Sequence, residues 1–252
     1  MLGSIEYYAR QRGYHILISA TDANESYLTL AKQRNLDGII VIGMYPDEFY
    51  QQMKRSRIPI VLIDSYCNDH YYHNVRIDDA YGSYLATKYV LERGHRDIAF
   101  FCGRIKDNGV MKKRLAGYRD ALGEYSVEFR DALVFEGDID YKDGIESANR
   151  LMDTQVNATA VVAAADILAI GAAKAFYERG VRVPDGISLM GFDDLEISQY
   201  LTPGLTTVRQ QISLKGEKAV ELLIRSINEP ELTKQELILP VSLVERESVK
   251  RI

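Results

Sequence analysis

A repeated alternation of short apolar runs with amphipathic segments limits the possible folds of this chain more than any other feature. Seven runs rich in apolar and β-branched residues begin at Tyr14, Gly38, Ile58, Asp97, Ala132, Ala158 and Ile187. Their length and composition predict buried strands. Between most of them apolar residues recur at helical spacing, and Gly94 and Gly180 stand where two of these helices should end. The chain is therefore predicted to be α/β, with parallel strands covered by helices on both faces.

The number of strand and helix units predicts two doubly wound parallel-sheet lobes, because seven or more units exceed what one ordinary open sheet needs. After Gln210 come one more helical segment and two extended runs, "QELILP" and "VSLVERES", which are separated by Pro240. Two late strands can complete two different sheets. We therefore expect the chain to cross between the lobes more than once and to leave a cleft between them.

Charge and cysteine content exclude several classes of protein. The formal net charge of the 252 residues is −5, so no overall positive field would hold this chain on a phosphate backbone. Cys67 and Cys102 are the two cysteines, and both are expected to be reduced thiols rather than a disulfide. Neither a membrane-spanning apolar run nor a signal peptide is evident. A cytoplasmic location is the resulting expectation.

The common enzyme signatures are absent from the sequence. It contains no Gly-rich dinucleotide fingerprint, phosphate-binding loop, nucleophile elbow or paired-histidine helix motif. We therefore expect neither catalysis nor a cofactor. His70 and His73 lie close together in "CNDHYYHN", where a solvated polar loop is favoured over a metal site.

Acidic residues follow three of the predicted strands, at Asp64, Asp166 and Asp193. Ligands of open α/β sheets bind outside the carboxyl ends of the strands, so these acids should line one crevice. Carboxylates accept strong hydrogen bonds from hydroxyl groups, which is the chemistry that a sugar requires. Arg114, near the start of a helix, can complement them because its planar fork donates to two oxygens at once.

Other interpretations of the same residues stay open at this point. An aspartate after a strand is often only the cap of the next helix, and this applies to Asp166 and to Asp78 or Asp79. Asp194 is expected to hold its turn rather than to contact a ligand. Arg114, taken by itself, would more often be a solvated helix residue.

Several motifs together resemble the lactose/galactose-repressor (LacI/GalR) family of bacterial transcription regulators. They are "TAVVAAADILAIGAAKAFYERG", "GVRVPDGISLMGFDD…YLTPGLTTVRQ", "IDDAYGSYLATKYVLERGHRDIAFFCG", "RLAGYRDAL" and "LILPVSLVERES". The resemblance covers essentially the whole chain and implies a periplasmic-binding-protein-like fold of two lobes joined by three crossovers. Residues 1–77 and 212–239 would form the N-terminal lobe, and residues 78–211 and 240–252 the C-terminal lobe.

The resemblance also implies a ligand site. Asp193 would contact effector hydroxyls, Arg114 would clamp the ligand from the other side of the cleft, and Asp64 and Gln210 would line the pocket, with Asp166 included among the ligand-binding residues. The chain departs from the family pattern in two places. Ala165 stands where many members have Asn, which removes one amide contact. Ile139 stands where an aromatic residue is common, which weakens the case for ring stacking.

Family members begin with a helix-turn-helix headpiece and a hinge helix, then the first strand and helix of the N-terminal lobe. This chain begins at what resembles the middle of that helix, "LGSIEYYARQRGYHILI". The headpiece, and with it the contact with operator DNA, is therefore expected to be absent from this chain. A missing first strand would leave a gap near the middle of the first sheet. A homodimer is expected to form through the helix carrying Ile170 and the loop near Leu201.

The function expected from these observations is effector sensing and dimerisation in a sugar-responsive repressor of a carbohydrate-utilisation operon. "GMYPDEFYQQM" and "LIDSYCNDHYYHN" resemble galactose-operon repressors, so galactose or a galactoside is the expected effector. A periplasmic-type sugar-binding protein of a transporter is the alternative with the same fold and pocket. An enzyme on this fold would need a nucleophile or an acid–base pair that no motif here supplies.

Overall fold

The chain divides into two compact units. The computed structural model describes residues 1–19, 29, 31, 33–55, 58–66, 71–106, 109–154 and 156–252. Unit 1 comprises Met1–Ile77 and Gln211–Leu239, and unit 2 comprises Asp78–Gln210 and Pro240–Ile252. The chain thus passes between the units three times. Gln211 falls in unit 1, whereas the sequence prediction placed it in the second lobe.

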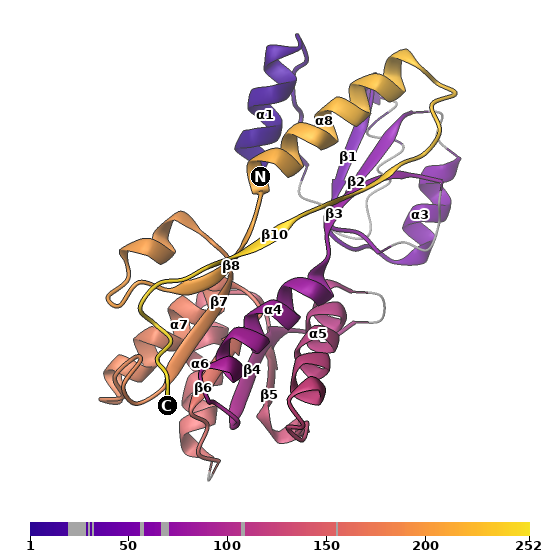
Figure 1. Cartoon of the computed structure of the whole chain (residues 1–252). Helices are drawn as coiled ribbons and strands as arrows, with labels where there is room; N and C mark the ends of the chain where they lie inside the picture. Colours follow the sequence, from indigo (N-terminus) through magenta and orange to yellow (C-terminus); the bar gives the residue numbers. More distant parts are fainter. Residues whose placement is uncertain are drawn as a thin grey trace. The chain divides into compact units, whose positions relative to one another are not determined.

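Unit 1 is built on a parallel sheet with the strand order β1-β2-β3-β9. The strands are β1 (Ile39–Ile42), β2 (Ile60–Ile63), β3 (His73–Ile77) and β9 (Glu236–Leu239). Among the described residues, its helices include α1 (Leu2–Gln11), α3 (Asp47–Lys54) and α8 (Ile212–Asn228). Figure 1 shows α1 beside α8, two segments from the opposite ends of the sequence.

The alternation of side chains along β2 explains how both faces of this sheet are covered. Val61 and Ile63 pack with residues of α1 and α8 in one apolar cluster. Ile60 and Leu62 point to the other face, where they join Phe49, Tyr50 and Met53 of α3. A strand with apolar side chains on both faces is stable only where helices cover both faces. The continuous apolar run in the sequence therefore forms an inner strand of the sheet.

Unit 2 is built on a larger sheet with the strand order β10-β8-β7-β6-β4-β5. The strands are β4 (Ile98–Gly103), β5 (Val134–Gly137), β6 (Ala160–Ala163), β7 (Ser188–Asp193), β8 (Thr206–Gln210) and β10 (Val241–Val244). The strands pair in parallel except β10, which runs antiparallel to β8 at the edge. The inner strands β4, β6 and β7 are almost wholly buried.

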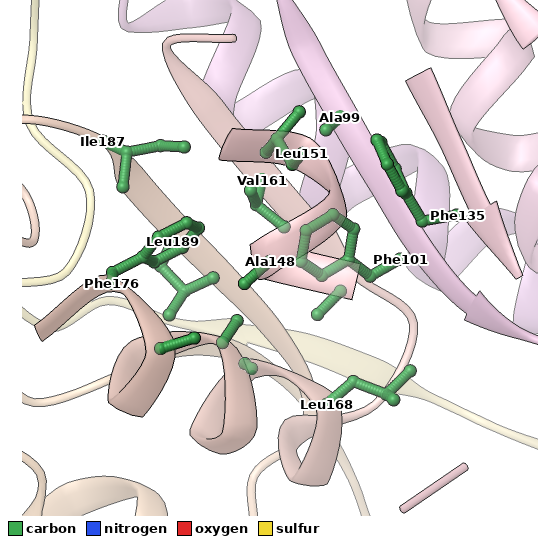
Figure 2. Packing of buried hydrophobic residues seen from close by; sticks show 14 of the residues in the cluster. Ala99, Phe101, Phe135, Ala148, Leu151, Val161, Leu168, Phe176, Ile187 and Leu189 are labelled. Atoms are coloured by element: carbon green, nitrogen blue, oxygen red, sulfur yellow. The ribbon is translucent and has the colours of Figure 1, made fainter. Parts of the chain in front are cut away.

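Two helix pairs cover the two faces of this sheet (Figure 1). The helices are α4 (Asp79–Glu92), α5 (Val110–Glu124), α6 (Tyr141–Asp153) and α7 (Asp166–Glu178), with short 3-10 helices η1 (Asp131–Leu133) and η2 (Glu196–Tyr200). Figure 2 shows the core beneath α6 and α7, where Leu151, Leu168 and Phe176 meet Val161 and Leu189 of the sheet. The α/β class and the two parallel-sheet lobes are thus confirmed.

The helix ends predicted at two glycines are confirmed. Gly94 follows α4 with a φ of 98°, and Gly180 follows α7 with a φ of 72°. A left-handed residue directly after a helix is favourable for glycine, which has no side chain to clash. No helix in the described part of the chain is long and apolar enough to cross a membrane.

The structure differs from the sequence prediction at two places in unit 1. Residues 14–19 are not in a strand, since they pair with no strand among the described residues, and most of them are exposed. An apolar hollow of about 820 Å³, lined in part by these residues and by β1, lies beside them. The second difference is β3, whose first two residues, His73 and Asn74, lie in the segment predicted to be a polar loop. Its residues pair in parallel with β2 and β9, and this pairing overrides the polar composition.

Candidate functional site

Arg114 is a buried cation at the first turns of α5 in unit 2. Its Nε and Nη2 both lie 2.8 Å from Oδ1 of Asp79, and its Nη1 donates to the carbonyl oxygen of Ala164. The guanidinium carbon lies 3.7 Å from the ring centroid of Phe192. The alternative interpretation of Arg114 as a solvated helix residue is therefore wrong. The side chain is held on three sides in one orientation.

Asp193 ends β7 beside this guanidinium. Its Oδ1 lies 3.7 Å from Nη1 of Arg114 and accepts a hydrogen bond of 2.5 Å from Nε2 of Gln210. The register explains the second contact, because Asp193 pairs with Arg209 across the ladder and Gln210 is the next residue of β8. The side chain of Asp193 keeps 19% of its surface exposed. Unit 2 thus brings together three of the residues predicted to bind ligand: Arg114, Asp193 and Gln210.

Asp194 holds the turn after β7, as the sequence predicted. Its two carboxylate oxygens accept hydrogen bonds from Arg209 at 2.6 Å and from Arg246 at 2.7 Å. Burial raises the pKa of Asp194, but the bonds from these arginines outweigh burial and hold the pKa below its ordinary value. This support matters because Asp193 and Asp194 have φ angles of 117° and 54°, in the left-handed region that disfavours residues with side chains.

Asp166 is enclosed in the interior of unit 2, and we do not retain it as a direct ligand contact. Its exposed fraction is 0%, and its oxygens accept from the amide of Leu195 and the hydroxyls of Ser198 and Thr207. The capping interpretation is wrong, since Ala165 is the N-cap of α7 and no side chain caps this helix. Burial raises the pKa of Asp166 to about 6, because its effect exceeds that of the hydrogen bonds, which lower the pKa.

The two neighbouring aspartates before α4 have different partners. Asp78 is the N-cap of α4, where it accepts a hydrogen bond of 3.0 Å from the amide of Tyr81, so the capping interpretation is confirmed for this residue. Asp79 is buried and pairs with Arg114 instead. Sequence spacing carries no signal for that pair, because the two residues are 35 positions apart on different helices.

Asp64 lies in unit 1, directly after β2, with a φ of 54°. Nζ of Lys215, from the first turn of α8, lies 2.6 Å and 2.8 Å from the two carboxylate oxygens. The side chain of Lys215 is 1% exposed and that of Asp64 is 21% exposed. Lys215 was not predicted from the sequence, although a lysine among the apolar residues of an amphipathic helix is a signal for a buried ion pair.

The two departures from the family pattern lie in different surroundings. Ala165 is buried at the start of α7. Ile139 is 50% exposed, and its side chain packs over Gly103 at the end of β4. It therefore places an aliphatic side chain at the carboxyl edge of the sheet in unit 2.

The residues predicted at a dimer interface are half-buried in unit 2. Ile170 lies on α7, and Leu201 follows η2 and packs against the core beneath α7. The same two elements also carry exposed large apolar side chains at Tyr177, Ile197 and Tyr200, which are 84%, 52% and 68% exposed.

Cys102 is a buried free thiol, and burial raises its pKa to about 12. His73 lies in β3 and is fully buried, which corrects its assignment to a solvated loop, and burial lowers its pKa to about 4. Cys67 and His70 lie outside the described residues. Among the residues that the structure describes, no group of three or more histidine, cysteine or acidic side chains could hold a metal ion.

Comparison with known proteins places the chain in a family. Residues 87–249 match the periplasmic binding protein-like domain. The chain is 34% identical over 248 residues to the HTH-type transcriptional regulator MalR of Clostridium butyricum, covering 94% of this chain and 73% of that protein. The chain belongs to the LacI family of transcriptional regulators.

Two further LacI-family proteins support this placement. The ribose operon repressor of Haemophilus influenzae is 30% identical, over 99% of this chain and 76% of that protein. The crystal structure of a LacI family transcriptional regulator from Enterococcus faecium with bound ribose has a TM-score of 0.91 at 27% identity, covering 100% of this chain and 93% of that one. These relatives are transcriptional regulators rather than enzymes. They favour the regulator over the transporter-type sugar-binding protein.

Proposed function

We propose that this chain is the effector-binding and dimer-forming region of a sugar-responsive LacI-family repressor. The observation that carries the proposal is the cluster of Arg114, Asp193 and Gln210 at the carboxyl ends of β7 and β8. It combines a fixed guanidinium, a partly exposed carboxylate and an amide at the edge where ligands of α/β sheets bind.

The charge balance of this cluster favours a neutral, hydroxyl-rich ligand. The guanidinium of Arg114 already faces two carboxylates, those of Asp79 and Asp193. Phosphate or another anion would have to approach these carboxylates, which repel it. A hydroxyl group instead donates to the Asp193 carboxylate and accepts from nitrogen donors such as Arg114 or Gln210.

Asp64 in unit 1 is proposed as a further ligand contact. Its carboxylate is held by Lys215 at the carboxyl end of β2, the equivalent position of the other sheet, and it keeps part of its surface exposed. Galactose or a galactoside is our specific candidate for the effector. Ribose is the competing candidate, because a ribose operon repressor and a ribose-bound regulator are similar to this chain.

We also propose that the protein acts as a homodimer through α7 and the segment around η2. Exposed Tyr177, Ile197 and Tyr200 on these elements are apolar surface that a partner copy would cover. Sugar binding would change operator affinity through the headpieces of the intact regulator. The sugar can do so only by binding one conformation of the dimer more tightly than the other.

Thermal unfolding with and without sugar tests the proposal. Galactose, lactose and ribose are screened at millimolar concentration, with sorbitol as an acyclic control, and one of the three sugars is expected to raise Tm. Asp193→Ala should abolish that increase. Asp153→Ala is the matched control, because it removes an exposed carboxylate that pairs with Arg179 on the surface of unit 2. A wild-type response in Asp193→Ala would place the site elsewhere, and no response to any of the sugars would contradict the sugar class.

A further inference from the structure

Asp166 stands at the meeting point of three elements of unit 2. Its Oδ2 accepts a hydrogen bond of 2.8 Å from the amide of Leu195, in the turn after β7, and one of 2.6 Å from the hydroxyl of Ser198 in η2. Its Oδ1 accepts a hydrogen bond of 2.6 Å from the hydroxyl of Thr207 on β8. One buried carboxylate therefore joins the turn that carries Asp193, the strand that carries Gln210 and the segment that carries the exposed Tyr200.

We propose that Asp166 is a positioning residue for the effector site, which fixes the turn carrying Asp193 and couples it to η2. The inference rests on the proposed function for its ligand, but the contacts of Asp166 can be tested without any ligand. Asp166 itself does not touch the sugar in this proposal. It acts through the Leu195 amide and the Ser198 hydroxyl.

The turn needs such support because its backbone is strained. Asp193 and Asp194 adopt left-handed φ angles in succession, and such conformations persist only where surrounding contacts hold them. Asp194 is held from one side by Arg209 and Arg246. The bond from Leu195 to Asp166 holds the other side, at the first residue after the strained pair.

The carboxylate of Asp166 packs closely against Gly191 of β7. A Cβ atom on Gly191 of β7 would lie 2.2 Å from Oδ1 of Asp166 and 2.9 Å from a methyl carbon of Leu205. The close approach of the strand therefore requires glycine at position 191. A larger residue at position 191 would displace the Asp166 carboxylate from the bonds that it accepts from Leu195, Ser198 and Thr207.

The same carboxylate connects the turn with the candidate dimer segment. Ser198 donates through its side chain to Asp166, while its amide bonds to Leu195 and its carbonyl accepts from the amide of Leu205. Ile197 and Tyr200, exposed in unit 2, flank it on η2. A shift of Asp193 on binding sugar would therefore be transmitted to η2 through Asp166.

The ionisation of Asp166 provides a readout that a purely structural residue would lack. The Asp166 carboxylate contacts one amide and two hydroxyl groups. The nearby charge that acts on its pKa is that of Asp193 in β7, and Asp193 is itself paired with Arg114 of α5. Burial raises the pKa of Asp166 to about 6. Above this pH the ionised carboxylate binds the Leu195 amide by a charge-assisted bond, which is stronger than the bond to a neutral carboxyl. The turn should loosen as pH falls below 6.

The first experiment measures hydrogen exchange of the Leu195 amide in the sugar-free protein, relative to the amide of Val161 in β6. In Asp166→Ala the Leu195 amide should exchange about tenfold faster or more, because it loses a buried acceptor. Leu151→Ala is the matched control, since it removes core packing beneath α6 without touching the turn. Unchanged relative exchange in Asp166→Ala would overturn the inference, whatever the protein binds.

The second experiment measures the dissociation constant at pH 7.5 and pH 5.2 for whichever of galactose, lactose and ribose gives the largest Tm increase. The wild type should bind several-fold more weakly at pH 5.2, because Asp166 is then mostly protonated. Asp166→Asn, which keeps an oxygen acceptor and the shape of the side chain, should bind equally at both pH values. At pH 7.5 it should bind about threefold to tenfold more weakly than wild type. A wild-type pH profile in Asp166→Asn would refute the positioning role, whereas no binding of any sugar by wild type would refute the proposed function alone.

Discussion

Both units contain an aspartate that faces a buried cation at the end of an inner strand, but the cation differs between them. In each, an aspartate directly after or at the end of an inner strand adopts a left-handed φ and faces a buried cation: Asp64 faces Lys215 in unit 1, and Asp193 faces Arg114 in unit 2. The lysine binds both oxygens of Asp64 at 2.6 and 2.8 Å. The arginine lies 3.7 Å from Asp193 and makes closer bonds to Asp79 and to the Ala164 carbonyl.

This difference shows how a lysine and an arginine can serve the same kind of aspartate, one adaptably and the other rigidly. A lysine is a point charge on a stem of rotatable bonds, and it imposes no fixed planar geometry on the carboxylate that it binds. A guanidinium has a fixed planar geometry, and Asp79, Ala164 and Phe192 fix its orientation before any ligand arrives. We infer that the buried cation of unit 2 is preorganised and that the buried cation of unit 1 is adjustable.

The largest expected effect is that of Arg114→Ala. The substitution leaves Asp79 buried without its counterion, so the free energy of unfolding should fall by about 3–5 kcal/mol, the usual result of breaking a buried pair. The unliganded fold is therefore expected to be weakened along with sugar binding. Urea denaturation measures the loss. A loss below about 1 kcal/mol would break the comparison, because Arg114 would then be no more fixed than a surface residue.

The pH dependence of stability sharpens the same comparison, because Asp166 supports the turn in unit 2. Its pKa is about 6 in the folded protein, against an ordinary value of 3.8, so the folded state binds the proton more tightly than the unfolded chain. Wild type should therefore gain stability relative to Asp166→Asn as pH falls from above 6 toward 4. The gain is at most about 3 kcal/mol for a shift of roughly two pH units. Urea titrations of both proteins at pH 7.5, 6 and 5 measure it, and parallel curves would contradict the assignment.

Asp64→Ala should have the smallest effect of the three. The substitution leaves the ammonium group of Lys215 buried without this carboxylate. Asp64 is partly exposed, however, so water can enter the space that it leaves and replace some of the lost interaction. We expect a loss of about 2 kcal/mol in the free energy of unfolding, with sugar affinity reduced but measurable. Asp138→Ala, which breaks an exposed pair with Arg104, serves as the control and should leave Tm unchanged. A larger loss for Asp64→Ala than for Arg114→Ala would reverse the assignment of the rigid and the adjustable cation.

The fold was largely predictable from the sequence because parallel strands buried on both faces leave continuous apolar runs. The runs beginning at Gly38, Ile58, Asp97 and Ile187 all contain strands of the structure. β3 was missed because His73 and Arg76 give it a polar composition, although its pairing with β2 and β9 buries most of it. Residues 14–19 have the composition of a strand, but composition alone does not provide a hydrogen-bonded neighbour.

The site was predictable in part, and the limit is physical. The position of Asp193 after a strand, the position of Arg114 near a helix start and the fold rule for ligand sites were sufficient to select both residues as candidates. The partners Asp79 and Lys215 could not be selected, because each pairs with a residue far away in the sequence through contacts that exist only after folding. Asp166 shares its position after a strand with Asp64. Only burial, which the sequence does not reveal, separates a turn-holding carboxylate from one that faces solvent.

The discontinuity of both units has a consequence for synthesis on the ribosome. Strand β9 completes the sheet of unit 1. Strand β10 pairs with β8 at the edge of the sheet in unit 2, and it is followed by Arg246, which binds Asp194. Neither sheet can therefore be complete until the final quarter of the chain has emerged. Until then the nascent polypeptide exposes the unpaired backbone of β3 and β8, and holding chaperones should find their binding sites at these two edges.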